Sequence, residues 1–162
     1  MTAFVRIVST LSRASGTISV LLLIAAILVV SEMVFVRYVL RASTIWQTEF
    51  VIYALVAATF LGSPYVLLHR GHVAVELLPD AVSPTSRRWL AILSGVLSLV
   101  FCALLAWSGW HYFAEAWKGG WTTDTVWALP LWIALMPLPA GISLLALQYI
   151  AEIWKNLGET TA

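Results

Sequence analysis

Four long apolar runs, separated by short polar connections, account for most of the chain. Asp, Glu, Lys and Arg make up 10% of its 162 residues and apolar residues 61%, whereas about 25% of the residues of a soluble domain are charged. So few charges cannot cover a folded domain with polar surface. We therefore expect an all-α integral membrane protein whose rare polar side chains are the first places to look for function.

The runs define four expected membrane-spanning helices in a single domain covering residues 1–162. Each run is near or above the ~20 residues that cross a hydrocarbon core of about 30 Å. None shows the period-two alternation of a transmembrane β-strand. No small-residue cleavage site follows the first run, so we expect it to stay uncleaved as the first span. The expected bounds are about 17–36, 46–68, 89–113 and 127–150.

The distribution of Lys and Arg indicates the orientation. The N-terminal lead, the middle loop and the C-terminal tail share one side and hold six of these residues, while the other side holds Arg37, Arg41 and Lys118. Because Lys and Arg accumulate on the cytoplasmic side, both termini are expected in the cytoplasm. Residues 4–13 and 72–78 combine apolar and charged positions, and each stretch is expected to form a short amphipathic helix in the membrane plane.

Tryptophans are concentrated near the expected ends of the spans, where indoles prefer to lie at the headgroup level. The chain has nine of them. Membrane anchoring accounts for most, but the stretch 107–132 is rich enough in tryptophan that a protein contact there is an open alternative.

Small residues recur at every fourth position in the second and third spans. Residues four apart share a helix face, and helices in lipid approach closely where small residues meet. We expect both stripes to line helix contacts, with chance as the alternative because Ala and Ser are common. Pro137 and Pro139 are expected to bend the fourth span near its centre. The stripes are Ala54, Ala58 and Gly62, and Ser94, Ser98, Cys102 and Ala106.

Charged residues near the turn between the first two spans are the main candidates for function. Glu32 could be a proton or ion site, but its position off the midplane favours a carboxylate that reaches the interface or bonds a neighbouring helix. An ion pair between Glu49 and Arg37 or Arg41 would hold the turn. Trp46, Glu49 and Tyr53 share one helix face, which we interpret as structural or partner-binding.

Patterns for cofactors and catalysis are weak. His111 lies roughly 33 Å along the third span from the level of His69 and His72, which argues against a haem held between facing helices. Three histidines and the single Cys102 do not make a tetrahedral zinc set. No nucleophile–base pair or phosphate-binding loop is present, and a net charge of +1 without a basic run gives no nucleic-acid signal. We predict no enzymatic activity, cofactor, metal or nucleic-acid partner.

Short motifs between residues 37 and 78 resemble those of a known family of membrane proteins. Together with the length and the four-span layout, they resemble the small membrane subunit of tripartite ATP-independent periplasmic (TRAP) transporters. Glu76 stands where that family usually has Asp, and Pro64 where a small residue is common. The motifs are Arg37-Tyr38, Trp46-Gln47-Thr48-Glu49-Phe50, Phe60-Leu61-Gly62 and Gly71-His72-Val73-Ala74-Val75-Glu76.

The resemblance implies a non-catalytic scaffold subunit of a sodium-coupled importer of organic acids in the bacterial inner membrane. The implied partners are a large multi-span permease subunit, which carries the substrate and sodium sites, and a periplasmic substrate-binding protein; membrane lipid surrounds the helices. Two other functions are weighed against it: a self-sufficient proton-coupled exporter that uses Glu32, and a membrane anchor for an oxidoreductase. The residues expected to hold the turn, the interfacial segment or the large-subunit contact are Arg37, Trp46, Glu49, Tyr53, Gly62, His72 and Glu76.

Overall fold

The computed structural model describes the backbone of residues 2–69 and 84–158. Four helices in these ranges are long and apolar enough to cross a membrane, the last of them made of two consecutive helices. The all-α class and the four spans are therefore confirmed. The helices are α1 (Thr2–Tyr38), α2 (Trp46–Leu68), α4 (Pro84–Gly119), α5 (Leu131–Leu135) and α6 (Pro137–Gly158).

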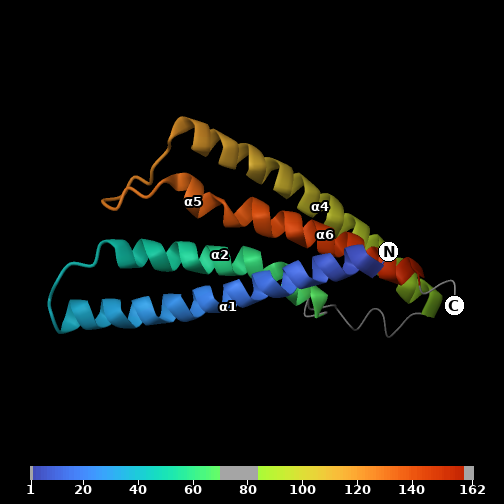
Figure 1. Ribbon diagram of the computed structural model, residues 1–162, viewed down its shortest axis with the longest axis horizontal. Helices are drawn as coiled ribbons and strands as arrows, with labels where there is room; N and C mark the ends of the chain where they lie inside the picture. Colours follow the sequence, from blue (N-terminus) through green and yellow to red (C-terminus); the bar gives the residue numbers. More distant parts are fainter. Residues whose placement is uncertain (1, 70–83, 159–162) are drawn as a thin grey trace.

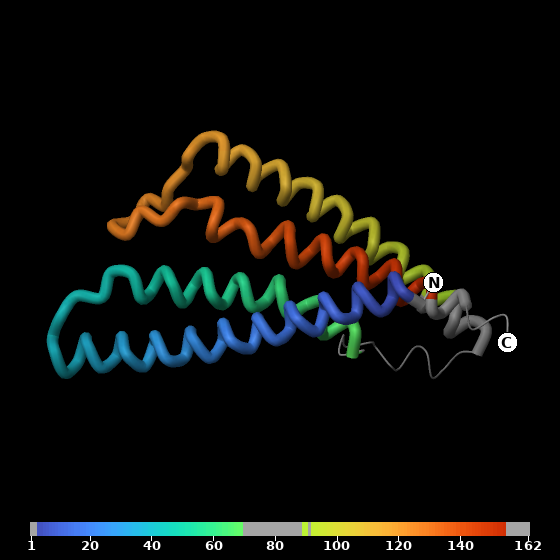
Figure 2. Tube along the Cα trace, viewed as in Figure 1, coloured from blue at the N-terminus to red at the C-terminus, as the bar shows by residue number. Residues whose placement is uncertain are grey.

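Two antiparallel helix pairs lie side by side (Figure 1). One pair is α1 with α2 and the other is α4 with α6; α2 and α6 form the contact between the pairs, and α1 also touches α6. The resulting order is α1–α2–α6–α4. The pairs lie closest at the end that holds the start of α1 and diverge toward the α1–α2 turn and the α4–α5 loop (Figure 2).

The N-terminal lead forms part of α1. The prediction that residues 4–13 make a separate helix in the membrane plane is wrong, because α1 is continuous over 37 residues. Gly16, the one residue there that favours a break, instead packs against the ring of Tyr65 on α2. The expected segment 72–78 lies outside the described residues. At 1.5 Å per residue α1 is about 55 Å long, well beyond a hydrocarbon core of about 30 Å.

A seam of small and apolar residues runs along α1 on the side facing its neighbours. Residues spaced alternately four and three apart along this face are all buried or half-buried. This spacing is the 3.5-residue repeat of helices that pack at a shallow left-handed angle. Ser and Ala in the seam allow close approach in lipid, where no hydrophobic drive turns apolar side chains inward. The seam consists of Val8, Ser12, Ser15, Ser19, Leu22, Ala26, Val29, Met33 and Val36.

Serine hydroxyls bond α1 to both of its neighbours. Ser12 Oγ donates to Gln148 Oε1 of α6 at 3.0 Å, and both residues are 0% exposed. Ser19 Oγ donates to the carbonyl oxygen of Ala58 on α2 at 2.6 Å. Polar bonds of this kind between membrane helices contribute about 0.6 kcal/mol on average. They therefore fix the register of α1 more than they add to its stability.

The fourth span begins later than expected and is broken near its start. Residues 121–130 form a loop in which Leu131 N donates to Trp121 O at 2.8 Å. The predicted start at residue 127 is wrong because Ala128 has a positive φ of 49° and Pro130 has no N–H to donate. The helix is interrupted at Met136, between α5 and α6, about a quarter of the way along the span, whereas the proline effect was predicted near its centre.

The backbones of α2 and α6 meet closely at Gly141 of α6. A Cβ atom at this position would lie 2.6 Å from the carbonyl carbon of Phe60 on α2, so only glycine allows the two backbones to meet there. Next to this contact, side chains from α2, α4 and α6 form a buried apolar cluster. Its buried members are Leu67, Cys102, Ile142 and Leu145.

Candidate partner-contact site

The turn between α1 and α2 is held by a hydrogen bond rather than by an ion pair. Arg37 Nη2 donates to Thr44 Oγ1 at 2.7 Å, and Arg41 has a positive φ of 52° within the turn. No ion pair joins Glu49 to Arg37 or Arg41 in the described part of the chain. The predicted pair is wrong because Thr44 engages the Arg37 guanidinium, while Glu49 lies a full turn into α2.

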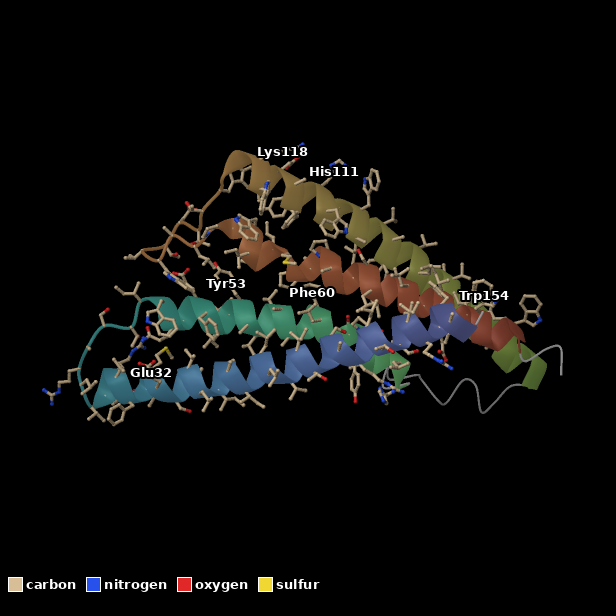
Figure 3. The ribbon with its side chains drawn as sticks, viewed as in Figure 1. Glu32, Tyr53, Phe60, His111, Lys118 and Trp154 are labelled. Atoms are coloured by element: carbon tan, nitrogen blue, oxygen red, sulfur yellow. The ribbon has the colours of Figure 1, made fainter. Side chains whose placement is uncertain are left out.

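Trp46, Glu49 and Tyr53 follow one another along the face of α2 that is directed toward the second helix pair. Trp46 contacts Trp127 of the α4–α5 loop with ring centroids 6.3 Å apart. Tyr53 lies on the α5 side of α2 (Figure 3). Glu49 is half-buried, and its Oε2 atom is buried without a hydrogen-bond partner. Burying a carboxylate oxygen costs free energy unless a hydrogen-bond donor reaches it. Among the described residues, none donates to Glu49 Oε2.

Glu32 and Gln47 meet in the contact between α1 and α2. Gln47 is 5% exposed, and its Nε2 donates to Glu32 Oε2 at 3.4 Å. Figure 3 shows Glu32 on the α2 side of α1. Thr48 Oγ1 bonds Met33 Sδ at 3.5 Å in the same contact. Glu32 is therefore a carboxylate bonded to the neighbouring helix, although its side chain remains exposed at the surface.

The two small-residue stripes lie in different surroundings. Ala54 and Ala58 are each 4% exposed, and a Cβ atom on Gly62 would lie 2.8 Å from Ser19 Oγ, so this stripe faces α1. In the third span the burial is uneven along the stripe: Cys102 is buried among residues of α2 and α6, Ser98 and Ala106 are half-buried, and Ser94 is exposed.

The remaining histidine and glutamate candidates fall partly outside the described residues. His72 and Glu76 lie outside the described residues. Within the described ranges, no group of three or more His, Cys, Asp or Glu is placed to hold a metal ion. His69 Nδ1 donates a hydrogen bond to the carbonyl oxygen of Tyr65 at 3.1 Å, and the centroid of the His111 ring lies 5.1 Å from that of Trp107 on α4.

Sequence reasoning did not find the buried pair Ser12–Gln148 or the burial of Gln47. Ser12, Ser15 and Ser19 follow one another at steps of three and four residues, and that spacing was the available signal. A search for small residues at every fourth position misses it, because these serines follow steps of three and four residues.

These features define a multi-pass helical membrane protein in which the polar groups bond helices to one another. Residues 26–159 match the family described as "Tripartite ATP-independent periplasmic transporters, DctQ component". The chain belongs to this family, which is a transporter component rather than an enzyme, and it is accordingly a multi-pass protein of the inner membrane.

A curated relative is the C4-dicarboxylate TRAP transporter small permease protein DctQ of Vibrio cholerae serotype O1 (strain ATCC 39315 / El Tor Inaba N16961). It is 23% identical to this chain over 144 residues. The match covers 75% of this chain and 62% of the length of the relative.

Proposed function

We propose that the protein is a non-catalytic scaffold subunit of a sodium-coupled, binding-protein-dependent importer of organic acids. In this role it pairs with the large membrane subunit, which carries the substrate and sodium sites, and a periplasmic protein delivers the substrate. The C4-dicarboxylates in the name of the Vibrio relative are one class of cargo that fits. We further propose that both termini lie in the cytoplasm, following the distribution of Lys and Arg.

The observation that carries the proposal is the buried, unpartnered oxygen of Glu49. Its own chain supplies no donor to it within the described residues, although Arg37 and Arg41 lie nearby in the sequence. Because Glu49 as a whole is only half-buried, its carboxylate can pair with a Lys or Arg of a second polypeptide at the part that stays accessible. Trp46 and Tyr53, beside Glu49 on α2, give such a partner an amphipathic aromatic rim, a composition common at protein interfaces.

Glu49→Ala is expected to weaken the complex with the large subunit. A hydrogen bond between charged groups contributes about 1.5–3 kcal/mol, so the dissociation constant should rise on the order of 10- to 100-fold. The measurement is co-purification of the large subunit through a tag on the small one. Glu115→Ala, at an exposed glutamate of α4, is the matched control. Equal recovery of the large subunit with both variants would count against Glu49 as a contact.

The Glu32→Gln variant distinguishes the scaffold hypothesis from the hypothesis of a self-sufficient exporter. A glutamine at position 32 keeps an oxygen for Gln47 Nε2 but cannot exchange a proton. The scaffold proposal predicts that substrate uptake by vesicles holding the complete transporter stays within about twofold of the wild type, since the loss is at most one weak interhelical bond. The chain reconstituted alone should carry no solute. Proton-coupled flux from the chain alone, abolished by Glu32→Gln, would establish the exporter instead.

A further inference from the structure

Two surface hollows on α4 join into one trough. The larger has a volume of about 550 Å³ and the smaller about 270 Å³, and they share Ala114. All lining residues come from α4, so the trough lies along a single helix. The larger hollow is lined by Ala103, Ala106, Trp107, Trp110, His111 and Ala114, and the smaller by Phe113, Ala114, Trp117 and Lys118.

The trough exists because alanines lie between bulky aromatic residues. At 100° per residue, Ala103 and Ala114 are nearly in line along the helix, with Trp107 on one side of that line and Trp110 on the other. His111 and Lys118 lie at the outer edge of α4 (Figure 3), whereas on the other side of the trough Trp110 Nε1 donates to Ser143 Oγ of α6 at 3.1 Å. Trp107 is 69% exposed. The trough is therefore open to the surroundings of the protein.

The length of the trough matches one leaflet of a membrane. From Ala103 to Lys118 the helix rises about 22 Å, against about 20–22 Å for one leaflet with its headgroups, half of a bilayer of about 40–45 Å. Lys118 lies next to the end of α4 at Gly119, where the chain leaves the apolar span. The apolar end at Ala103 then reaches the middle of the bilayer, and the end at Lys118 reaches the headgroups.

The charged residue that lines the headgroup end of the trough is a cation, Lys118. Lys118 is exposed and forms no ion pair within the described ranges. Glu115, also exposed, lies about 60° around the helix from Lys118 and does not line the trough. Asp124 is in the α4–α5 loop. His111 adds a ring nitrogen about 10 Å deeper than Lys118, at a depth suited to a glycerol ester oxygen.

We propose that the trough binds one acyl chain of an anionic phospholipid, with Lys118 at the phosphate and the indoles of Trp107 and Trp110 against the chain. A narrow channel between two indoles fits an acyl chain, whereas a partner helix is about 10 Å across and packs best on small residues. The site is separate from the face of α2 that carries Glu49. It does not depend on the proposed role as a transporter subunit.

Tryptophan quenching by brominated lipids tests the site on the full chain in phosphatidylcholine vesicles. At equal mole fraction, brominated phosphatidylglycerol should quench the Trp107 and Trp110 emission more strongly than brominated phosphatidylcholine, with an apparent affinity higher by about fivefold. The emission that these residues contribute is the difference between the wild type and the double variant Trp107→Phe/Trp110→Phe. Equal quenching by the two lipids would overturn the proposal.

Three variants assign the preference to the trough. Lys118→Gln should abolish the preference for phosphatidylglycerol while leaving quenching by brominated phosphatidylcholine. Ala114→Leu should fill the trough and reduce quenching by both lipids. Arg41→Gln, at an exposed cation on the same side of the membrane, is the control and should keep the preference. A preference that survives Lys118→Gln, or that Arg41→Gln removes equally, would show general surface charge and overturn the site. Loss of all quenching when the large subunit is added would show that protein occupies the trough, which also overturns it.

Discussion

Gly141→Ala is expected to destabilise the protein strongly by separating the two helix pairs. The added methyl group would meet the carbonyl group of Phe60, with the carbonyl carbon at 2.6 Å. Backbone atoms cannot rotate out of the way, so α2 and α6 must move apart and open the cluster around Cys102. Overpacking of this kind costs about 1–3 kcal/mol, and sometimes more. The measurement is the unfolding of the purified chain in mixed micelles, followed by circular dichroism.

Gly109→Ala is the matched control for this experiment. Its added methyl group would lie 2.6 Å from Leu138 Cδ2, a distance like that at Gly141. The obstacle is the end of a flexible side chain that can change rotamer. We expect a clearly smaller loss of stability, and equal losses for the two variants would contradict the tight backbone contact at Gly141.

Ala58→Leu should have the second large effect, by separating α1 from α2. Ala58 is 4% exposed, and its carbonyl oxygen accepts the hydrogen bond from Ser19 Oγ at 2.6 Å. A leucine side chain at this point has no free volume, so the strain of about 1–3 kcal/mol adds to the loss of the interhelical bond. Unfolding in mixed micelles should occur at a lower fraction of denaturing detergent than for the wild type.

Thr59→Leu introduces the same side chain one residue further along α2. Thr59 is exposed, and its hydroxyl bonds only the carbonyl of Leu55 in its own helix at 2.8 Å. The stability of this variant should stay near that of the wild type. A comparable loss at position 59 would mean that leucine disturbs α2 itself rather than its contact with α1.

The four spans could be predicted from the sequence because hydrocarbon imposes a minimum apolar length on any helix that crosses it. The inward face of α1 could not be found in the same way. In residues 4–13 the apolar pattern was interpreted as one face of an interfacial helix, and Ile7 and Leu11 of that face are 60% and 50% exposed. In lipid the inward side of a helix is the one with small or polar residues, so Ser12 marks it and leucine does not.

The partners of individual side chains were harder to predict than the elements that carry them. Arg37 and Glu49 are close in sequence, but the turn geometry brings the guanidinium to Thr44. Glu32 was expected to reach the interface or bond a neighbouring helix, and its bond to Gln47 follows from the antiparallel pairing of α1 with α2. The late start of the fourth span depends on the left-handed backbone at Ala128, which composition does not indicate.

The divergence of the two helix pairs toward the α1–α2 turn (Figure 1) gives the protein an unequal cross-section. It displaces more lipid from the leaflet at that end than from the opposite one. The bilayer must respond to a wedge of this shape by curving, by thinning on one side, or by placing another molecule between the two helix pairs. The elastic energy of the surrounding membrane therefore depends on which molecule lies beside Trp46 and Trp127. This ring pair connects the two helix pairs at the end where they diverge.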